Sequence, residues 1–345
     1  MRKRIFIPTD SSEGIDKEVF MRDYTPSLTQ CMARDEDNFW QSQGIPVQLD
    51  TYDVTKLFYR KAWVDVPPKP RTDDKRYTVV RSKVNQDGLE VIVCLPQENA
   101  PSPTIVICLG GPAVSPPDVF EKDSIYSFLM QSGYALIIPL RRGMNGISQE
   151  WEKALEGHYG VYDVMDTVEA TRYVCARYPQ TIDSNRLFLY GGSYGGYVAA
   201  LIAGKANGDR LFKAVISHCG VYDLGTYPWH NSGIPKETMM TYGGTMDETE
   251  YVKNVSEISP KTYVSEWNVP VLLIHHLSDT SSWFGQSVMA YNDALQMGKQ
   301  VQLLLVPGPH GYDISSRKQL FEKIVTFFAN SLQTISSTVQ HGGLE

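Results

Sequence analysis

The stretch that decides the fold is RLFLYGGSYGGYVAALIAG, residues 186–204. It opens on a short, mostly apolar run typical of a buried strand, and it closes on the composition of a buried helix. Between the two parts, Gly191, Ser193 and Gly195 form the pattern G-x-S-x-G. A glycine-rich turn that merely starts a helix can carry the same letters. Between a strand and a helix, however, the turn projects the serine hydroxyl, so the sequence predicts Ser193 as a nucleophile.

Short apolar runs alternate with longer amphipathic runs around this turn. The runs predicted to be buried strands are TIVICL at 104–109, YALIIPL at 134–140, RLFLY at 186–190, KAVISH at 213–218, PVLLIHH at 270–276 and VQLLLVP at 301–307. The segments predicted to be helices are 119–132, 161–178, 194–206, 285–297 and 317–332. Upstream, RYTVVRSKV and LEVIVCLP are separated by NQDG, which predicts a hairpin. The alternation indicates an α/β fold with a doubly wound, mostly parallel sheet, whose site lies at the carboxyl ends of the strands.

The composition excludes several classes of protein. Of 345 residues, 42% are hydrophobic and 21% are charged, which is typical of a globular chain. The formal net charge is −7, from 32 Lys and Arg against 39 Asp and Glu, which argues against nucleic-acid or anionic-membrane binding. No apolar run reaches the roughly 18 residues of a membrane helix, and the basic start MRKRIFIPTD breaks off before a signal-peptide core forms. The five cysteines include no CxxC pair, so we expect reduced thiols and a cytoplasmic protein.

A serine nucleophile needs a base and an acid that follow it in the chain. His310 stands in VQLLLVPGPHGYD, where prolines and glycines make a stiff loop after a predicted strand, so we expect it to be the base. Asp279 follows another predicted strand and is expected to orient the imidazole. Asp223 also follows a strand and is its rival.

The other histidines have different expected roles. His275 and His276 are adjacent at a strand end, so their side chains point to opposite faces and cannot both ligate one metal or both reach Ser193. We therefore expect them to be structural, and we expect no metal site. His218 ends another predicted strand and is a weaker candidate for lining the site.

Several strings together resemble the catalytic domain of the prolyl oligopeptidase family of serine peptidases, over about 76–332. The branches that fit best are the dipeptidyl peptidases and the acylaminoacyl peptidases. The matching strings are LGGP at 109–112, RRGMNGISQEW at 141–151, GGSYGGY at 191–197, SP at 259–260, VPVLLIHHLSD at 269–279 and PHG at 309–311. The resemblance implies an α/β-hydrolase fold and a triad of Ser193, Asp279 and His310, which are the residues that the sequence patterns select by themselves.

The oxyanion hole is expected to consist of backbone N–H groups. Tyr194 follows the nucleophile, and its N–H faces the site in this type of turn. The resemblance places the second donor in the LGGP loop, at Gly110 or Gly111. Members of the family commonly have His or Tyr where this chain has Leu109, and Leu109 cannot donate a hydroxyl.

The resemblance also implies a pocket for the acyl group, bordered by GVYDLGTYPWHNSGIPKETMMTYGG at 220–244. Tyr227 and Trp229 are the best candidates for lining it, because flat rings pack against a proline or a similar apolar group. His230 is a candidate polar contact. The alternative is that these rings belong to the core or to a lid.

Three segments are expected along the chain: an N-terminal extension at 1–75, the catalytic domain at 76–335 and a tail at 336–345. The extension contains a possible helix at 27–41, and it has no repeat that would indicate the β-propeller of many family members. Its aromatic residues predict packing against the body, either as a cap over the site or along a remote edge of the sheet: Phe39, Trp40, Phe58, Tyr59 and Trp63.

The sequence thus predicts a serine hydrolase that cleaves an amide or peptide bond through an acyl-enzyme on Ser193. An esterase or acyl-transfer enzyme acting on a small metabolite is the first alternative, and a non-catalytic binding protein on the same fold is the second. The expected substrate is a small peptide or a small ester or amide. The mechanism needs no cofactor, and a homo-oligomer is compatible with the sequence.

Overall fold

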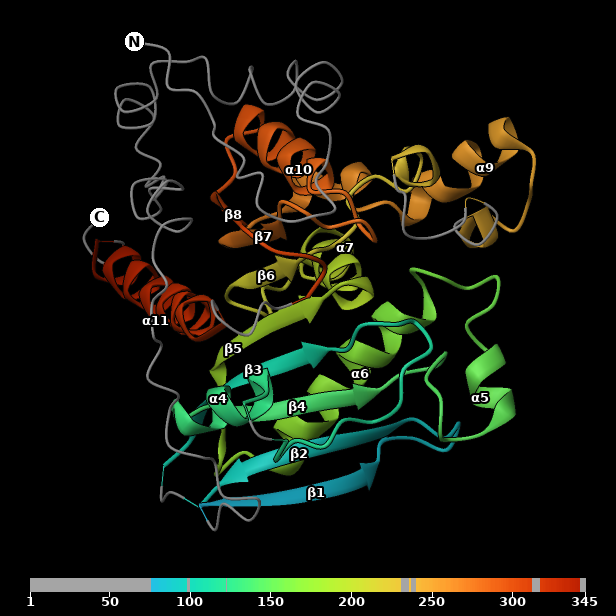
Figure 1. The fold of residues 1–345 in the computed structure, drawn as a ribbon. Coiled ribbons are helices and arrows are strands. Elements are labelled where there is room, and N and C mark those ends of the chain that lie inside the picture. Colours follow the sequence, from blue (N-terminus) through green and yellow to red (C-terminus); the bar gives the residue numbers. More distant parts are fainter. Residues whose placement is uncertain are drawn as a thin grey trace.

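The computed structural model describes residues 76–97, 100–121, 123–230, 236, 240–311 and 317–341. Within this part of the chain, eight strands form one sheet in the order β1-β2-β4-β3-β5-β6-β7-β8 (Figure 1). The predicted N-terminal extension, with its helix at 27–41 and its cap or arm, lies outside the described residues.

The strands agree with the sequence prediction in number and in their positions along the chain. Their bounds are β1 Tyr77–Lys83, β2 Glu90–Pro96, β3 Ser102–Cys108, β4 Ala135–Leu140, β5 Ile182–Gly192, β6 Val215–His218, β7 Val271–His276 and β8 Val301–Val306. The expected hairpin of β1 and β2 is antiparallel, and β2 also pairs antiparallel with β4. All the other neighbouring strands are parallel. The prediction of a mostly parallel α/β sheet is confirmed.

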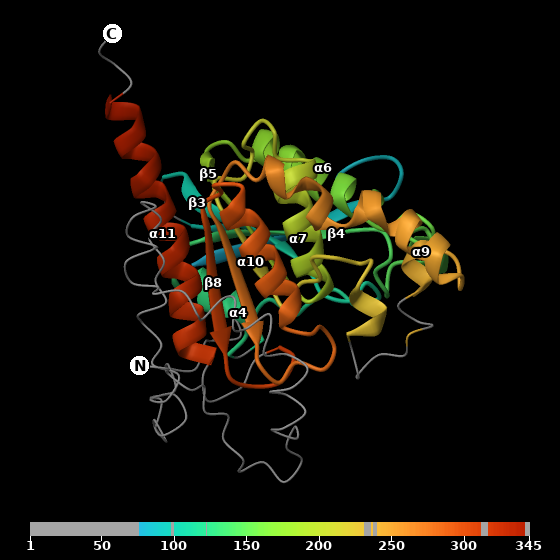
Figure 2. The same cartoon turned by 90° about the horizontal axis from the view of Figure 1, so that it is seen from above.

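The helices are α4 Ile125–Gln131, α5 Gln149–Lys153, α6 Tyr162–Arg177, α7 Tyr194–Lys205, α9 Glu248–Val255, α10 Gly285–Gln296 and α11 Arg317–His341. Short 3₁₀ turns lie at Tyr227–Trp229, Thr241–Gly243, Ser256–Ile258 and Pro260–Glu266. Helices α4 and α11 lie on one side of the sheet, whereas α6 and α7 lie on the other (Figure 2).

Both faces of the sheet are buried, which explains why its strands are apolar runs without alternation. Successive residues of β2 point to opposite faces: Val91 and Val93 join the core beneath α6 and α7, while Ile92 and Cys94 join the core beneath α4 and α11. Each face therefore needs apolar side chains, and the strand shows no polar face.

Two helices differ in length from the prediction. Helix α4 was expected from residue 119 but begins at Ile125, because the Ser124 side chain accepts the N–H of Ser127 and caps it there. Helix α11 continues to His341 and so passes residue 335, where the catalytic domain was expected to end. The polar residues after 335 contain no helix breaker before Gly342. A helix therefore occupies most of the expected tail.

Helices α5 and α9 were not predicted. They have five and eight residues, so neither presents a periodic apolar face long enough to stand out in the sequence. A side-chain cap fixes the start of each helix: Ser148 accepts the N–H of Trp151, and Asp247 accepts the N–H of Glu250.

The parallel register brings three strand ends together. Gly192 of β5 pairs with His218 of β6, and His218 pairs with Ile274 of β7. The turn after β5 and the loops after β7 and β8 consequently meet at the carboxyl edge of the sheet. The four described cysteines, Cys94, Cys108, Cys175 and Cys219, are free thiols. Among the described helices, none is both long and apolar enough to cross a lipid bilayer.

Candidate active site

The turn between β5 and α7 holds Ser193 in a strained backbone conformation. Its φ is +57° and its ψ is −122°. Residues other than glycine rarely adopt this backbone conformation, which costs on the order of 1–3 kcal/mol. The N–H of Ser193 donates to the carbonyl of His218 over 2.8 Å, which fixes the turn against β6. A Cβ on Gly191 would lie 1.9 Å from the Gly195 carbonyl oxygen, and a Cβ on Gly195 would lie 2.0 Å from that of Cys108. Only glycine fits at these two positions, so the turn explains the G-x-S-x-G pattern.

The structure brings together the three residues that the sequence selected as a triad. The Ser193 hydroxyl lies 2.8 Å from Nε2 of His310, and Nδ1 of His310 lies 2.7 Å from Oδ2 of Asp279. These two contacts require one tautomer of His310, in which it donates its Nδ1–H to the carboxylate and accepts the serine proton at Nε2. The geometry suits a general base that is held in place by an acid.

The carboxylate of Asp279 is fully buried and firmly held. Its Oδ1 accepts the N–H groups of Ser281 and Ser282 over 2.9 and 2.8 Å. Burial by itself raises the pKa of Asp279, but hydrogen bonds with His275 and His310, together with the Ser282 N–H, outweigh it and hold the pKa well below its usual range. Asp279 is therefore ionised at neutral pH.

His275 is a contact of Asp279 that the sequence reasoning missed. Its Nε2 lies 2.6 Å from the carbonyl oxygen of Ser282 and 3.4 Å from Oδ2 of Asp279, while its Nδ1 lies 2.7 Å from the hydroxyl of Ser287. The imidazole thus approaches the same carboxylate oxygen, Oδ2, that His310 contacts. The sequence analysis placed His275 and His276 on opposite faces of the strand, but no sequence signal indicated which neighbours His275 would contact.

The candidate oxyanion donors lie on two sides of the nucleophile. Tyr194 is the first residue of α7, so its N–H has no acceptor one turn earlier within the helix. Gly110 approaches closely from the other side, since a Cβ built on it would lie 3.7 Å from Cβ of Ser193. Gly111 has φ +112°, which favours glycine. The role of the three residues as oxyanion donors stays a prediction.

The three candidate pocket residues differ in burial and in the residues that they contact. Tyr227 is buried, and its hydroxyl donates to the carbonyl of Ser281, in the loop that carries Asp279. Trp229 is 41% exposed, and its ring lies beneath the ammonium of Lys236. His230 is exposed, and its ring stacks on that of Trp283 at 4.8 Å. Tyr227 and His230 thus both contact the loop between β7 and α10 that carries Asp279, whereas the described contacts of Trp229 are with other residues.

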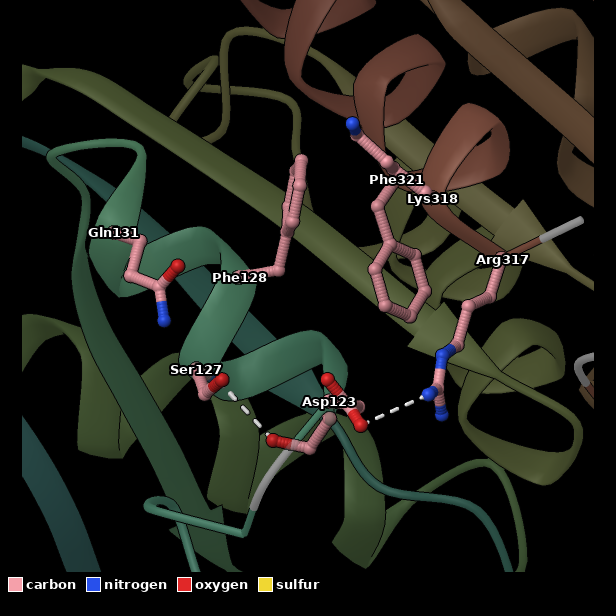
Figure 3. Close-up of a pocket in the computed structure, with 8 residues that line it drawn as sticks. Asp123, Ser127, Phe128, Gln131, Arg317, Lys318 and Phe321 are labelled. Carbon is pink, nitrogen blue, oxygen red and sulfur yellow. Dashed lines mark hydrogen bonds and ion pairs between the residues drawn. The ribbon is translucent and has the colours of Figure 1, made fainter. Parts of the chain in front are cut away.

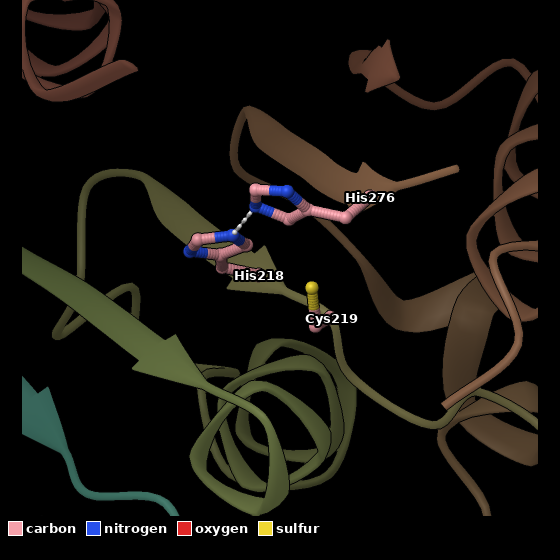
Figure 4. A group of neighbouring side chains, drawn as sticks. All are labelled: His218, Cys219 and His276. Atoms are coloured by element: carbon pink, nitrogen blue, oxygen red, sulfur yellow. Dashed lines mark hydrogen bonds between the residues drawn. The ribbon is translucent and has the colours of Figure 1, made fainter. Parts of the chain in front are cut away.

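A chain of hydrogen bonds links Tyr190, His218, His276 and Pro307, and Figure 4 shows its central contact, between His218 and His276. Nε2 of His218 lies 3.0 Å from Nε2 of His276, and Nδ1 of His218 lies 2.9 Å from the hydroxyl of Tyr190. Nδ1 of His276 lies 3.3 Å from the carbonyl oxygen of Pro307, which can only accept. The direction of the chain follows: Tyr190 donates to His218, His218 donates to His276, and His276 donates to Pro307. Both imidazoles are neutral in this arrangement.

The thiol of Cys219 lies beside this pair, and its backbone φ is +52°. Its sulfur and a ring nitrogen of each histidine lie within 4.8 Å of one another, a set of donors that suits a soft metal ion. The 3.0 Å contact, however, uses the Nε2 atoms of both rings in one hydrogen bond. We therefore assign the cluster to hydrogen bonding within the core.

The histidine pair predicts a loss of stability in mild acid. Burial and the neighbouring imidazoles lower the pKa of His218 well below its usual value, and burial lowers that of His276 to about 4. Histidine in an unfolded chain titrates near pH 6.5. Below that pH the unfolded state therefore binds more protons than the folded state, and the free energy of unfolding falls. The contribution of His276 to the free energy of unfolding should fall by about 2 kcal/mol between pH 7 and pH 5.

Urea unfolding at the two pH values, for wild type and His276→Gln, measures this contribution. The substitution removes one titrating group, so the variant should lose less free energy of unfolding on acidification than wild type does. Equal losses in the two proteins would mean that His276 is not held neutral by the fold.

A separate hollow lies between α4 and α11 (Figure 3). The residues that line it are Asp123, Ser124, Ser127, Phe128, Gln131, Arg317, Lys318 and Phe321. At one end, the guanidinium of Arg317 lies 3.0 Å from Oδ2 of Asp123. This hollow contains none of the predicted site residues, and we assign no chemistry to it.

The family model for the prolyl oligopeptidase family matches residues 120–334. The chain belongs to this family. The matched segment includes all three members of the Ser193, Asp279 and His310 constellation, and the resemblance that the sequence strings carried is confirmed.

Similar proteins with curated names include dipeptidyl-peptidase 5 of Porphyromonas gingivalis, which is 26% identical over 225 residues, or 65% of this chain and 32% of that protein. Acylamino-acid-releasing enzyme 1 of Oryza sativa subsp. japonica is 25% identical over 226 residues, or 63% of this chain and 28% of that protein. Among solved structures, the acylaminoacyl peptidase of Pyrococcus horikoshii matches with a TM-score of 0.64 and 25% identity, over 73% of this chain and 41% of that one. The chain spans about a third of the length of these curated relatives.

Proposed function

We propose that the protein is a serine hydrolase that cleaves an amide or peptide bond through an acyl-enzyme on Ser193. The observation that carries the proposal is the continuous chain of hydrogen bonds from Ser193 through His310 to the buried Asp279, at 2.8 and 2.7 Å. Membership of the prolyl oligopeptidase family supports it, as do the peptidase names of the similar proteins.

The proposed reaction has two halves. His310 takes the proton of Ser193 as the serine oxygen attacks the substrate carbonyl, and the N–H groups of Tyr194 and of Gly110 or Gly111 stabilise the oxyanion. His310 then gives the proton to the leaving amine, which departs and leaves the acyl-enzyme. Water attacks this ester with His310 as the base, and the acid product leaves. Asp279 stabilises the imidazolium in each half without becoming protonated.

The substrate class that we propose is a short peptide or an N-acylated amino acid. Both classes occur in the names of the similar proteins, as dipeptidyl peptidase and acylamino-acid-releasing enzyme. Esters are the second candidate, because the side chain of Leu109 adds no hydroxyl to the oxyanion hole, and an ester with a good leaving group makes smaller demands on it.

A matched panel tests the proposal. The substrates are an N-acetyl-amino-acid p-nitroanilide, a dipeptide p-nitroanilide and the p-nitrophenyl ester of the same acetylated amino acid. We expect turnover of at least one anilide, and we expect that turnover to disappear in Ser193→Ala. Turnover of the ester alone would identify an esterase, whereas a protein that hydrolyses nothing and does not react with a fluorophosphonate would be a binding protein.

A further inference from the structure

Arg141 is a buried cation whose hydrogen bonds converge on the loop at 109–112. It follows β4 directly, and only 1% of its surface is exposed. Its two terminal nitrogens contact four backbone carbonyl oxygens. Nη2 donates to Leu109 and Gly110 over 3.2 and 2.8 Å, and Nη1 donates to Pro112 and Arg142, each over 3.3 Å.

Two of these carbonyls belong to the peptide units that carry the candidate oxyanion donors. The carbonyl of Leu109 shares its peptide group with the N–H of Gly110, and the carbonyl of Gly110 shares its peptide group with the N–H of Gly111. A guanidinium bound to the oxygen of a planar peptide fixes the direction of its N–H. It also polarises the group, so that the N–H becomes a stronger donor.

Arg141 also contacts the residue that supplies the other donor. Its guanidinium lies over the ring of Tyr194, 4.7 Å from the ring centroid. The hydroxyl of Tyr194 donates to the carboxyl group of Asp163, which is fully buried. One cation therefore touches both sides of the candidate oxyanion hole.

We propose that Arg141 is a positioning residue of the oxyanion hole, a role that rests on the proposed hydrolase function. It holds the peptide groups of Gly110 and Gly111 and the ring of Tyr194 in one arrangement. Its charge polarises the loop amides toward the developing oxyanion. The contribution appears when negative charge forms on the substrate oxygen, so it lowers the barrier more than it strengthens substrate binding.

The neighbouring arginine provides a matched control. Arg142 lies next in the chain, but its guanidinium pairs with the carboxylate of Asp166 at 2.5 Å and stacks on the ring of Tyr162 at 3.8 Å. None of its side-chain hydrogen bonds to described residues reaches the loop at 109–112. Removing the Arg142 side chain should lower stability, because it leaves the buried carboxylate of Asp166 without its cation, but it should not disturb the oxyanion hole.

The experiment compares wild type with Arg141→Met, Arg141→Lys and Arg142→Met. It measures kcat and KM for p-nitrophenyl acetate, the rate of labelling by a fluorophosphonate, the inhibition constant of phenylboronic acid and the melting temperature. Phenylboronic acid forms a tetrahedral adduct with a reactive serine and so reports on binding of the transition state. We expect Arg141→Met to lower kcat about 100-fold, the scale of losing one oxyanion donor, with KM changed far less.

The inhibition constant of phenylboronic acid should rise in Arg141→Met together with the loss of kcat. Arg141→Lys keeps the charge and should recover part of kcat, and it serves as the test variant if Arg141→Met does not fold. Arg142→Met should melt at a lower temperature and keep kcat within a few-fold of wild type. The inference is overturned if Arg141→Met and Arg141→Lys keep wild-type kcat, or if Arg142→Met loses as much kcat as Arg141→Met. A wild type that neither labels nor hydrolyses would instead overturn the proposed function, and this inference with it.

Discussion

Replacing Ser193 by alanine is expected to lower kcat by about 10⁵-fold or more, the scale seen when a triad nucleophile is removed. Among the described residues, Ser193 is the hydroxyl hydrogen-bonded to Nε2 of His310, 2.8 Å away, so none of the others can take its place. Covalent labelling by a fluorophosphonate should disappear with the activity. The melting temperature should stay near that of wild type, since the strain of the turn resides in the backbone and the removed hydroxyl leaves no buried charge.

Ser217→Ala is the matched control for this variant. Ser217 is buried on the strand beside the turn, but its hydroxyl donates to the carbonyl of Gly196 and not to a histidine. The variant should keep full labelling by the fluorophosphonate. Labelling that persists in Ser193→Ala, or that disappears in Ser217→Ala, would show that the nucleophile has been misassigned.

Replacing Asp279 by asparagine is expected to lower kcat by about 10³–10⁴-fold, because an amide no longer holds the imidazole in the required tautomer. In wild type the carboxylate accepts Nδ1–H of His310 over 2.7 Å and stabilises the imidazolium. In the variant, the amide group favours the tautomer that carries its proton on Nε2, which cannot accept the proton of Ser193. KM should change much less than kcat. The activity of the variant should recover in part at alkaline pH, where hydroxide from the solvent can take the proton of Ser193.

Asp223→Asn is the control, since Asp223 was the rival candidate for the acid. Its carboxylate binds the ammonium of Lys261 at 2.9 Å and the N–H of Gly225 at 2.9 Å, and His310 is not among its partners. We expect this variant to lose stability and to keep kcat within about tenfold of wild type. A larger loss of kcat at Asp223 than at Asp279 would contradict the assignment of the acid.

The sequence by itself determined the fold class, the positions of the strands along the chain and the candidates for the triad, with Asp223 left as a rival to Asp279 for the acid. It did so because these features depend on local rules. Buried strands are short and apolar, the turn at Ser193 requires glycine at positions 191 and 195, and the acid and base follow strands that end at the same edge of a parallel sheet. The strings shared with the family added the loop at 109–112.

The choice between similar residues depended on contacts that no local pattern encodes. Asp279 and Asp223 both follow strands, and only the folded chain places one of them 2.7 Å from His310. His218 and His276 lie 58 residues apart, yet the register of β6 against β7 brings their Nε2 atoms to within 3.0 Å of each other.

Arg141 was an ordinary arginine within a matching string. It became a candidate positioning residue only because the loop at 109–112 folds its carbonyls onto the guanidinium. The reason is physical. Secondary structure follows from neighbours in the chain, whereas hydrogen bonds between side chains at a strand edge follow from how distant loops pack against one another.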